Sequence, residues 1–264
     1  MNLTIVGCSG STSGPDSAAS CYLVQAPYAG SVFSLVLDFG PGAFGALYSH
    51  LHPSQVDAIA LSHLHPDHCL DLCAYYVGAT YSTPGAQWAK RPLYAPVGAA
   101  DRLSLAYNAP TLDGVEPPAG EPMLSHFEHH TWQPVQTIGP FTVETAPVAH
   151  PVETYAVRVE ENGPGGGTLV YSGDTGPTES LTALAAGADL LLVEAAFMDR
   201  ADNRPALHLC GREAAEIGQR AGVGRVLLTH IPPWHDREAV LAEATPHFSG
   251  PVSLAMPGAV WTIG

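Results

Sequence analysis

The chain has 264 residues, of which 46% are hydrophobic and 13% are charged, and this balance excludes a disordered chain. Ten basic residues against 25 acidic ones give a net charge of −15. A protein that grips long nucleic acid or an anionic membrane surface needs many Lys and Arg side chains. A large nucleic-acid footprint and an association with membranes are therefore disfavoured.

In the first half of the chain, short apolar segments alternate with segments of helical periodicity. We predict strands at residues 3–6, 21–25, 32–38, 56–61 and 93–95. Helices are predicted at residues 67–80 and 97–107, and residues 108–122 have the composition of a loop. The segment at residues 7–14, GCSGSTSG, is interpreted as the turn after the first strand, with anion binding by its backbone as an alternative.

The second half continues the alternation. Strands are predicted at residues 141–145, 154–159, 168–172, 189–193, 225–229, 252–255 and 260–263. Helices are predicted at residues 178–186, 212–221 and 237–244. The glycine-rich segment at residues 163–167 is interpreted as a hairpin tip, because no Lys-Ser/Thr pair and no helix follow it as in a phosphate loop. No linker divides two cores, so we predict a single α/β domain over residues 1–264.

The cysteines and the apolar runs bear on the environment of the protein. The apolar runs are too short for a transmembrane helix, and the first residues have a strand pattern rather than that of an export signal. Five cysteines, an odd number, favour a reducing cytoplasm without disulfides. Cys69 and Cys73 lie one helical turn apart and are interpreted as small buried apolar side chains rather than metal ligands.

The segment SHLHPDH, residues 62–68, carries most of the chemical information. It follows a predicted strand and precedes a predicted helix. His63 and His65 leave the strand two residues apart and project to the same side, while Asp67 and His68 lie on the turn into the helix. Imidazole and carboxylate groups at this density suit zinc or a similar divalent ion. A chance histidine cluster in an exposed loop is the less favoured alternative.

Three further metal-ligand candidates lie at predicted strand ends. His150 lies between two strands, and Asp174 and His230 each follow an apolar strand directly. Taken alone, each has an ordinary explanation, such as a structural histidine or an Asp in a turn. Taken together, they predict one cluster at a single edge of a sheet, where functional loops commonly lie.

The HLHPDH motif followed by His150, Asp174 and His230 resembles the metallo-β-lactamase superfamily, and the resemblance spans nearly the whole chain. It implies an αββα four-layer sandwich with two divalent metal ions at one edge, bridged by Asp174. The ligands implied for the first ion are His63, His65 and His150. Those implied for the second are Asp67, His68 and His230. Zinc fits these ligands, and manganese or iron could occupy the same set.

Within the superfamily the chain is most similar to the short-form ribonuclease Z-like branch, which cleaves phosphodiesters. True β-lactamases usually have Cys where Asp174 stands, and the flavodiiron branch has Glu at the position of His65. In the ribonuclease Z-like branch, the residue matching His208 contacts the phosphate as a general acid, and the one matching Glu194 orients it. A helix-capping or surface histidine is the alternative for His208. Asp67 is expected to orient the attacking water or to accept a proton from it.

The substrate is expected to be small. Ribonuclease Z proper carries a long arm that clamps tRNA between the positions of His150 and Asp174, whereas here only residues 151–173 separate them. The chain is similar to actinobacterial members proposed to hydrolyse cyclic nucleotides. We therefore expect hydrolysis of 3′,5′-cyclic nucleotides, cyclic AMP first, although Pro66 stands where class II cyclic nucleotide phosphodiesterases usually have Leu. The resemblance also implies a homodimer.

Three other functions stay open at this point. They are a ribonuclease Z-type tRNA 3′-end endonuclease, a hydrolase of another ester or thioester, and a non-catalytic metal-binding scaffold. The first is disfavoured by the missing arm and the acidic charge, and the last by the presence of every ligand of the motif. A panel of substrates would separate the hydrolases.

Several neighbouring residues are interpreted with open alternatives. Trp234 either stacks on a nucleobase or packs behind a Pro-Pro turn. Arg204 is a candidate phosphate contact in the segment 197–207, which could form a lid. Asp38 is either a hydrogen-bond partner of a ligand histidine or an ordinary strand-end residue. A second histidine cluster is interpreted as an exposed loop or a dimer edge; its members are His126, His129 and His130.

Overall fold

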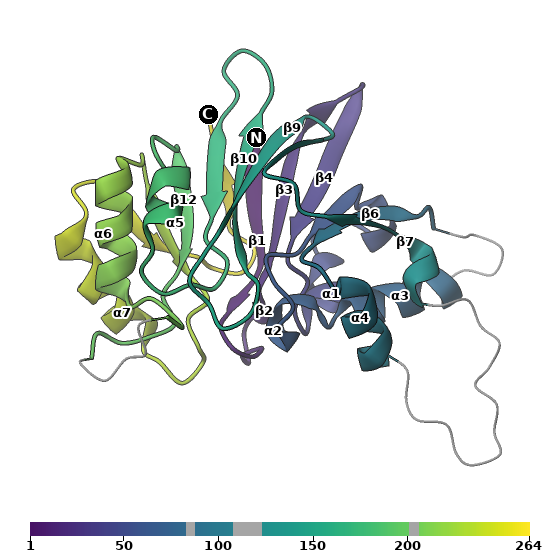
Figure 1. Cartoon of the computed structure of the whole chain (residues 1–264), viewed down its shortest axis with the longest axis horizontal. Helices are drawn as coiled ribbons and strands as arrows, with labels where there is room; N and C mark the ends of the chain where they lie inside the picture. The colour runs from purple at the N-terminus through teal and green to yellow at the C-terminus, as the bar shows by residue number, and fades with distance from the viewer. Residues whose placement is uncertain (83–87, 108–122, 201–205) are drawn as a thin grey trace.

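A computed structural model describes residues 1–82, 88–107, 123–200 and 206–264, and shows two β-sheets packed face to face with helices on their outer sides (Figure 1). The predicted αββα sandwich is therefore confirmed. Within these residues, no helix is long and apolar enough to cross a membrane.

The first sheet contains the N-terminal strands and one strand from the C-terminus. Its strands follow the order β15-β1-β3-β4-β5-β6-β7, with the short β2 paired to β1. Their bounds are β1 Asn2–Ser9, β2 Ala18–Ala19, β3 Cys21–Tyr28, β4 Ser31–Leu37, β5 Ala58–Ala60, β6 Arg91–Ala95, β7 Phe127–Thr131 and β15 Val260–Thr262. The pairs from β4 to β7 are parallel, so these strands end at one edge of the sheet.

The second sheet follows the order β14-β13-β12-β11-β10-β9-β8. Its strands are β8 Val135–Ile138, β9 Phe141–Pro147, β10 Tyr155–Glu161, β11 Thr168–Tyr171, β12 Leu190–Glu194, β13 Val226–Thr229 and β14 Val252–Leu254. Strands β8 to β11 pair antiparallel, and residues 163–167 lie in the turn between β10 and β11, as predicted. Strands β11 to β14 run parallel, so their carboxyl ends also meet at one edge.

Helices cover the outer face of each sheet. Beside the first sheet lie α1 Ala43–Leu47, α2 Pro66–Cys69, α3 Leu72–Tyr81 and α4 Ala99–Tyr107. Beside the second lie α5 Glu179–Leu184, α6 Gly211–Ala221 and α7 Arg237–Ala244. Single 3-10 turns occur at Pro53–Gln55, Met123–His126 and Thr245–His247.

Three apolar layers hold this arrangement together, and the strand periodicity explains them. Successive side chains of a strand point to opposite faces of the sheet. In β3, Tyr22 and Val24 thus pack between the sheets against Phe141, while Cys21 and Leu23 face the first helical layer. Strands buried on both faces are apolar at nearly every position, which is why β1, β4, β12 and β13 were recognisable in the sequence.

Several predicted elements differ from those observed. The predicted helix at residues 67–80 is two helices, α2 and α3. The helix breaks between them because its backbone bonds to Phe39 instead: the N–H of Phe39 donates to the carbonyl of His68, and the N–H of Asp71 donates to the carbonyl of Phe39. The Asp71 carboxylate also accepts a hydrogen bond from the N–H of Phe44. Helix α1 and strand β8 were not predicted, since five and four residues are too short to show a period.

The second histidine cluster was interpreted as an exposed loop or a dimer edge; His129 and His130 are exposed as expected, but the loop assignment is wrong. His129 and His130 lie in β7, paired with β6, and His126 lies in the preceding 3-10 turn. An edge strand has one neighbour, so its side chains are largely solvated and its sequence lacks the apolar alternation of an inner strand. Residues 108–122, predicted as a loop, lie outside the described part of the chain.

Candidate metal centre

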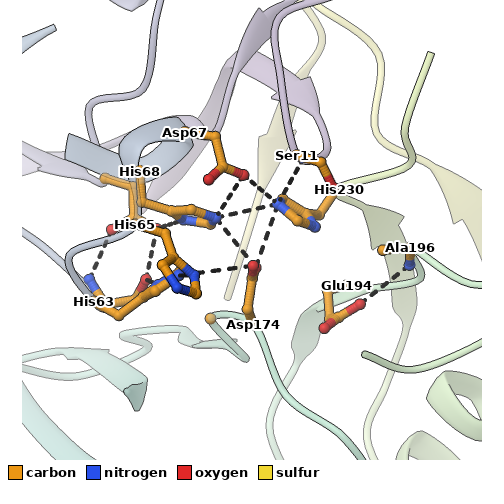
Figure 2. A network of polar contacts seen from close by, with 12 residues as sticks. Ser11, His63, His65, Asp67, His68, Asp174, Glu194, Ala196 and His230 are labelled. Atoms are coloured by element: carbon orange, nitrogen blue, oxygen red, sulfur yellow. Dashed lines mark hydrogen bonds and ion pairs between the residues drawn. The ribbon is translucent and has the colours of Figure 1, made fainter. Parts of the chain in front are cut away.

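Segments that follow the parallel strands of both sheets carry nearly all the polar side chains of the site. Asp38 follows β4 and His63 follows β5, while Asp174 and His230 follow β11 and β13. The carboxyl ends of these strands meet at one edge of the sandwich, which brings together groups that are far apart in sequence. The cluster predicted at one sheet edge is formed there (Figure 2).

A first group of ligand atoms comes from three histidines. The Nε2 atom of His63 lies 3.1 Å from Nδ1 of His65, and Nε2 of His150 also lies 3.1 Å from that Nδ1 atom. His63 is fully buried, whereas His65 and His150 are half-buried. Burial lowers the pKa of all three imidazoles, most strongly that of His63, so each is neutral and offers a nitrogen lone pair.

A second group lies on the other side of Asp174. Nε2 of His230 lies 3.0 Å from Oδ2 of Asp67 and 3.1 Å from Nε2 of His68. Nε2 of His68 lies 3.3 Å from the same Asp67 oxygen. Burial opposes ionisation of Asp67, but its contacts with His230 and His68 outweigh that effect and hold the pKa of the carboxyl far below its usual range.

Asp174 lies between the two groups with one oxygen toward each. Its Oδ2 atom is 3.7 Å from Nε2 of His63, and its Oδ1 atom is 3.2 Å from Nε2 of His68 and 3.4 Å from Nε2 of His230. Although Oδ1 is buried, it has no hydrogen-bond partner among the described residues. A buried carboxylate oxygen without a donor is costly, and a cation at this position would satisfy it.

The two groups therefore fit divalent metal ions. Each consists of imidazole nitrogens and carboxylate oxygens that converge on one point, with every ligand atom within 4.8 Å of the others. Neighbouring imidazole nitrogens 3.1 Å apart repel unless a proton or a cation lies between them. Nitrogen and oxygen ligands in this mixture suit zinc and other borderline divalent ions. The resemblance assigned these residues to two ions, and the structure places them in the same two groups.

Asp38 holds ligands of both groups through one buried carboxylate. Its Oδ2 atom accepts hydrogen bonds from Nδ1 of His68 at 2.7 Å, from the Ser62 hydroxyl at 2.8 Å and from the Tyr171 hydroxyl at 2.7 Å. Its Oδ1 atom accepts a bond of 2.7 Å from the N–H of Ser62. The Ser62 hydroxyl in turn lies 3.0 Å from Nδ1 of His63. The carboxylate thereby orients both His68 and His63.

Asp38 adopts a left-handed backbone conformation with φ of 57°, which only Gly, Asn and Asp adopt readily. This conformation places the carboxylate beneath the site, between the ends of β4 and β5. The carboxylates of Asp174 and Asp38 raise the pKa of His68 well above its usual value, although burial alone would lower it. Of the two interpretations considered from the sequence, the structure shows Asp38 as a hydrogen-bond partner of His68, a candidate ligand.

The half-buried His208 pairs with the fully buried Glu194 beside the candidate metal centre. Nδ1 of His208 lies 2.8 Å from Oε1 of Glu194 and 4.0 Å from Oδ2 of Asp174. The Glu194 carboxylate also accepts hydrogen bonds from the N–H groups of Thr175 at 2.8 Å and Ala196 at 3.1 Å, so its position is fixed. Burial lowers the pKa of His208, but the Glu194 carboxylate outweighs this and raises it to about 9.

The imidazole of His208 is flanked by ligands of both groups. Its ring centroid lies 5.6 Å from the ring of His150 and 5.6 Å from that of His230. Nδ1 of His150 donates a hydrogen bond of 2.9 Å to the carbonyl of Leu207, which links this ligand to the segment that carries His208. His208 thus stands where a group bound at the metal centre would meet it.

The remaining residues considered from the sequence lie outside the two ligand groups or outside the described part of the chain. Trp234 is 64% exposed, so it does not pack behind the Pro-Pro turn, and its ring lies beside that of His235. Arg204 lies outside the described residues, together with residues 201–203 and 205 of the predicted lid. Cys69 is buried and Cys73 is partly buried, and neither belongs to a group of metal-ligand atoms.

Two polar residues of the site were not identified from the sequence. Ser62 immediately precedes His63, and its position in the motif was the only signal. Tyr171 ends the apolar strand β11 and is fully buried, so its pattern is that of a core aromatic residue. Only the packing of the two sheets shows that its hydroxyl reaches Asp38.

The sequence of this chain matches a known family and several relatives. The model of the β-lactamase superfamily domain matches residues 34–231. The uncharacterized protein Rv1339 of Mycobacterium tuberculosis is 43% identical over 96% of this chain and 88% of its own length. The probable metallo-hydrolase YhfI of Bacillus subtilis is 31% identical, with 99% of both chains covered.

A solved structure and a ribonuclease Z are also similar to this chain. The crystal structure of YhfI has a TM-score of 0.82 and 29% identity to this chain, again over 99% of both. A ribonuclease Z of Mycobacterium bovis is 29% identical over 88% of this chain and 86% of that protein. Fold, site geometry and sequence similarity together show that this chain belongs to the metallo-β-lactamase superfamily and is a metallo-hydrolase.

Proposed function

We propose that this hydrolase is a dinuclear metal-dependent phosphodiesterase that cleaves a small phosphodiester, in the first place a 3′,5′-cyclic nucleotide to the nucleoside monophosphate. The observation that carries the proposal is the arrangement of two ligand groups bridged by Asp174, with the His208–Glu194 pair beside them. A diester phosphate is an anion with a poor leaving group, so its hydrolysis needs both charge neutralisation and a proton donor.

Two divalent ions, zinc or alternatively manganese or iron, would neutralise the phosphoryl oxygens and lower the pKa of a water molecule. His63, His65 and His150 would hold one ion, Asp67, His68 and His230 the other, and Asp174 both. Asp38 keeps the protons of His68 and His63 on the nitrogens that face away from the ligand groups.

The side chains around these ligands supply the proton chemistry. Asp67 is ionised, and its free carboxylate oxygen would orient the attacking water. As the water oxygen bonds to phosphorus, the bond to the leaving ester oxygen breaks. His208, kept protonated at neutral pH by Glu194, would donate its proton to that oxygen, and the proton released from the water restores the acid.

The proposal of a small substrate rests on charge and chain length. The net charge of −15 opposes a long phosphate backbone, and β10 joins β11 through a short turn where a tRNA-binding arm would be inserted. The relative named ribonuclease Z keeps a tRNA 3′-end endonuclease as the second candidate. A hydrolase of another ester or thioester is the third, and the protonated His208 beside the site favours a phosphoryl substrate over it.

A substrate panel tests the proposal. Purified protein reconstituted with zinc or manganese would be incubated with 3′,5′-cyclic AMP, a tRNA precursor and a thioester, and the products would be separated by chromatography. We expect conversion of cyclic AMP to AMP at the highest kcat/KM of the three. Preferential cleavage of the tRNA precursor or of the thioester would overturn the proposal in favour of the corresponding alternative.

A further inference from the structure

A largely apolar pocket of about 340 Å³ opens beside the first ligand group. Its lining includes Pro66, Val97 and Val152, together with His65. Val97 is 70% exposed and Val152 is 39% exposed, so both offer apolar surface to a molecule that enters the pocket. Pockets of about 300–1,000 Å³ with apolar walls and a few polar groups are typical of small-molecule sites.

The loops that carry the metal-ligand candidates also form this pocket. His65 belongs to both the pocket and the first ligand group, and Val152 follows His150 by two positions. Val97, a third lining residue, lies between β6 and α4, shortly after the carboxyl end of a parallel strand. A molecule held at the first ligand group therefore has this pocket as the adjoining apolar surface.

Arg102 supplies the polar group of the pocket. Its Nε atom donates a hydrogen bond of 3.3 Å to the carbonyl of Leu64, which fixes the side chain, and its two terminal nitrogens donate no hydrogen bond to the part of the chain that the structure describes. Within the described ranges, no carboxylate forms an ion pair with this guanidinium, although the chain carries an excess of acidic residues. The neighbouring Glu153 instead accepts a hydrogen bond of 2.7 Å from the Tyr155 hydroxyl.

We propose that this pocket binds the nucleobase of the substrate, with the ring against Pro66, Val97 and Val152 and with Arg102 donating to acceptor atoms on the edge of the ring. The proposal rests on the phosphodiesterase function proposed above and names the part of the substrate that the pocket recognises. A guanidinium carries only donors, so it suits the ring nitrogens and carbonyl oxygens of a base. Ribose and phosphate would lie toward the ligand groups.

The test compares nucleoside monophosphates with a sugar phosphate that lacks the base. Binding of adenosine or guanosine 5′-monophosphate and of ribose 5-phosphate to the zinc-reconstituted protein would be measured by calorimetry. We expect the nucleotides to bind more tightly. Arg102→Met should weaken nucleotide binding about tenfold, the lower range for a hydrogen bond to a charged group, and leave ribose 5-phosphate within about twofold. Val97→Asp should act in the same selective way.

Matched controls separate the pocket from general damage. Arg220→Met removes an exposed guanidinium paired with Glu179, and Val135→Asp places the same charge at an exposed valine of β8; neither should change binding. Equal affinity of the wild-type protein for nucleotides and ribose 5-phosphate would overturn the proposal. A parallel loss of both affinities in the Arg102 variant would overturn it too, because that pattern indicates displacement of Leu64 and His65.

Binding is measured without turnover, so the two proposals fail separately. Base-dependent binding that is lost in the variants, without hydrolysis of cyclic nucleotides, would support the pocket and refute the phosphodiesterase. Hydrolysis of cyclic AMP with no effect of Arg102→Met or Val97→Asp on nucleotide affinity would support the enzyme and refute the pocket.

Discussion

Replacement of Asp38 by Asn tests how the buried network controls the metal centre. The carboxylate accepts four hydrogen bonds, three on Oδ2 and one on Oδ1. An amide has one acceptor oxygen. If that oxygen takes the place of Oδ2, the amide NH₂ group faces the N–H of Ser62, which lay 2.7 Å from Oδ1. One buried donor is then left without an acceptor, and the negative charge that orients His68 and His63 is lost.

The expected magnitudes follow from these contacts. Removal of one partner of a buried ion pair, here the Asp38 carboxylate beside His68, costs about 3–5 kcal/mol of folding stability, a large share of the total for a domain. Substitution of a residue that orients metal ligands weakens metal affinity or activity about 10- to 100-fold, which corresponds to about 1.4–2.7 kcal/mol. Asp38→Asn should therefore lower both the melting temperature of the apoprotein and the zinc affinity, and with them the turnover.

Zinc affinity would be measured by competition with a chromophoric chelator at a temperature where circular dichroism shows the variant to be folded. Asp57→Asn is the matched control, because this carboxylate also accepts a backbone N–H, that of Ser34 at 2.8 Å, but contacts no ligand histidine. A folded Asp38→Asn protein that binds zinc as tightly as the wild type would refute the assigned role of the network.

Three further substitutions test the surroundings of the site. His208→Ala should lower turnover of cyclic AMP by about 10²- to 10⁴-fold with metal content near that of the wild type, measured by mass spectrometry; loss of metal would instead make it a ligand. Glu194→Gln removes the carboxylate that raises the pKa of His208 to about 9, so the alkaline limb of the kcat profile should move to lower pH, and an unchanged limb would contradict the assignment. Gly40→Ala would place a Cβ atom 1.9 Å from the carbonyl of Asp67. It should destabilise the fold by about 1–3 kcal/mol and weaken zinc binding, whereas Gly45→Ala, with no atom within 4 Å, should do neither in denaturant titrations.

Much of the fold could be predicted because its strands are buried on both faces or end in distinctive residues. The apolar runs of β12 and β13 and the turn at residues 163–167 are local signals, and the observed sheet contains them. Strand β7 shows the limit. Its residues FEHHT have no apolar alternation, since a strand with a single neighbour exposes most of its side chains, and only tertiary pairing with β6 makes it a strand.

The residues of the candidate site likewise fall into those that a local sequence signal reveals and those that only tertiary packing reveals. The ligand candidates could be predicted because His and Asp at strand ends are chemically conspicuous, and parallel strands bring such ends together. Tyr171 could not, because a tyrosine at the end of an apolar strand has the pattern of a core residue. Its hydroxyl meets Asp38 across a separation of 133 residues, and a contact of that range depends on how the two sheets pack. The proposed contact of Arg102 with a nucleobase could not be predicted either, because it depends on a pocket that residues 64–66, Val97 and Val152 form only in the folded chain.

Anomalous diffraction from crystals grown with zinc tests the dinuclear centre most directly. Two zinc peaks are predicted. One should lie among His63, His65 and His150, and the other among Asp67, His68 and His230. Both should contact Asp174, and both should be lost or weakened in crystals of Asp174→Ala. A single peak, peaks elsewhere on the chain, or two peaks that persist unchanged in Asp174→Ala would contradict the bridged two-metal centre on which the proposed phosphodiesterase depends.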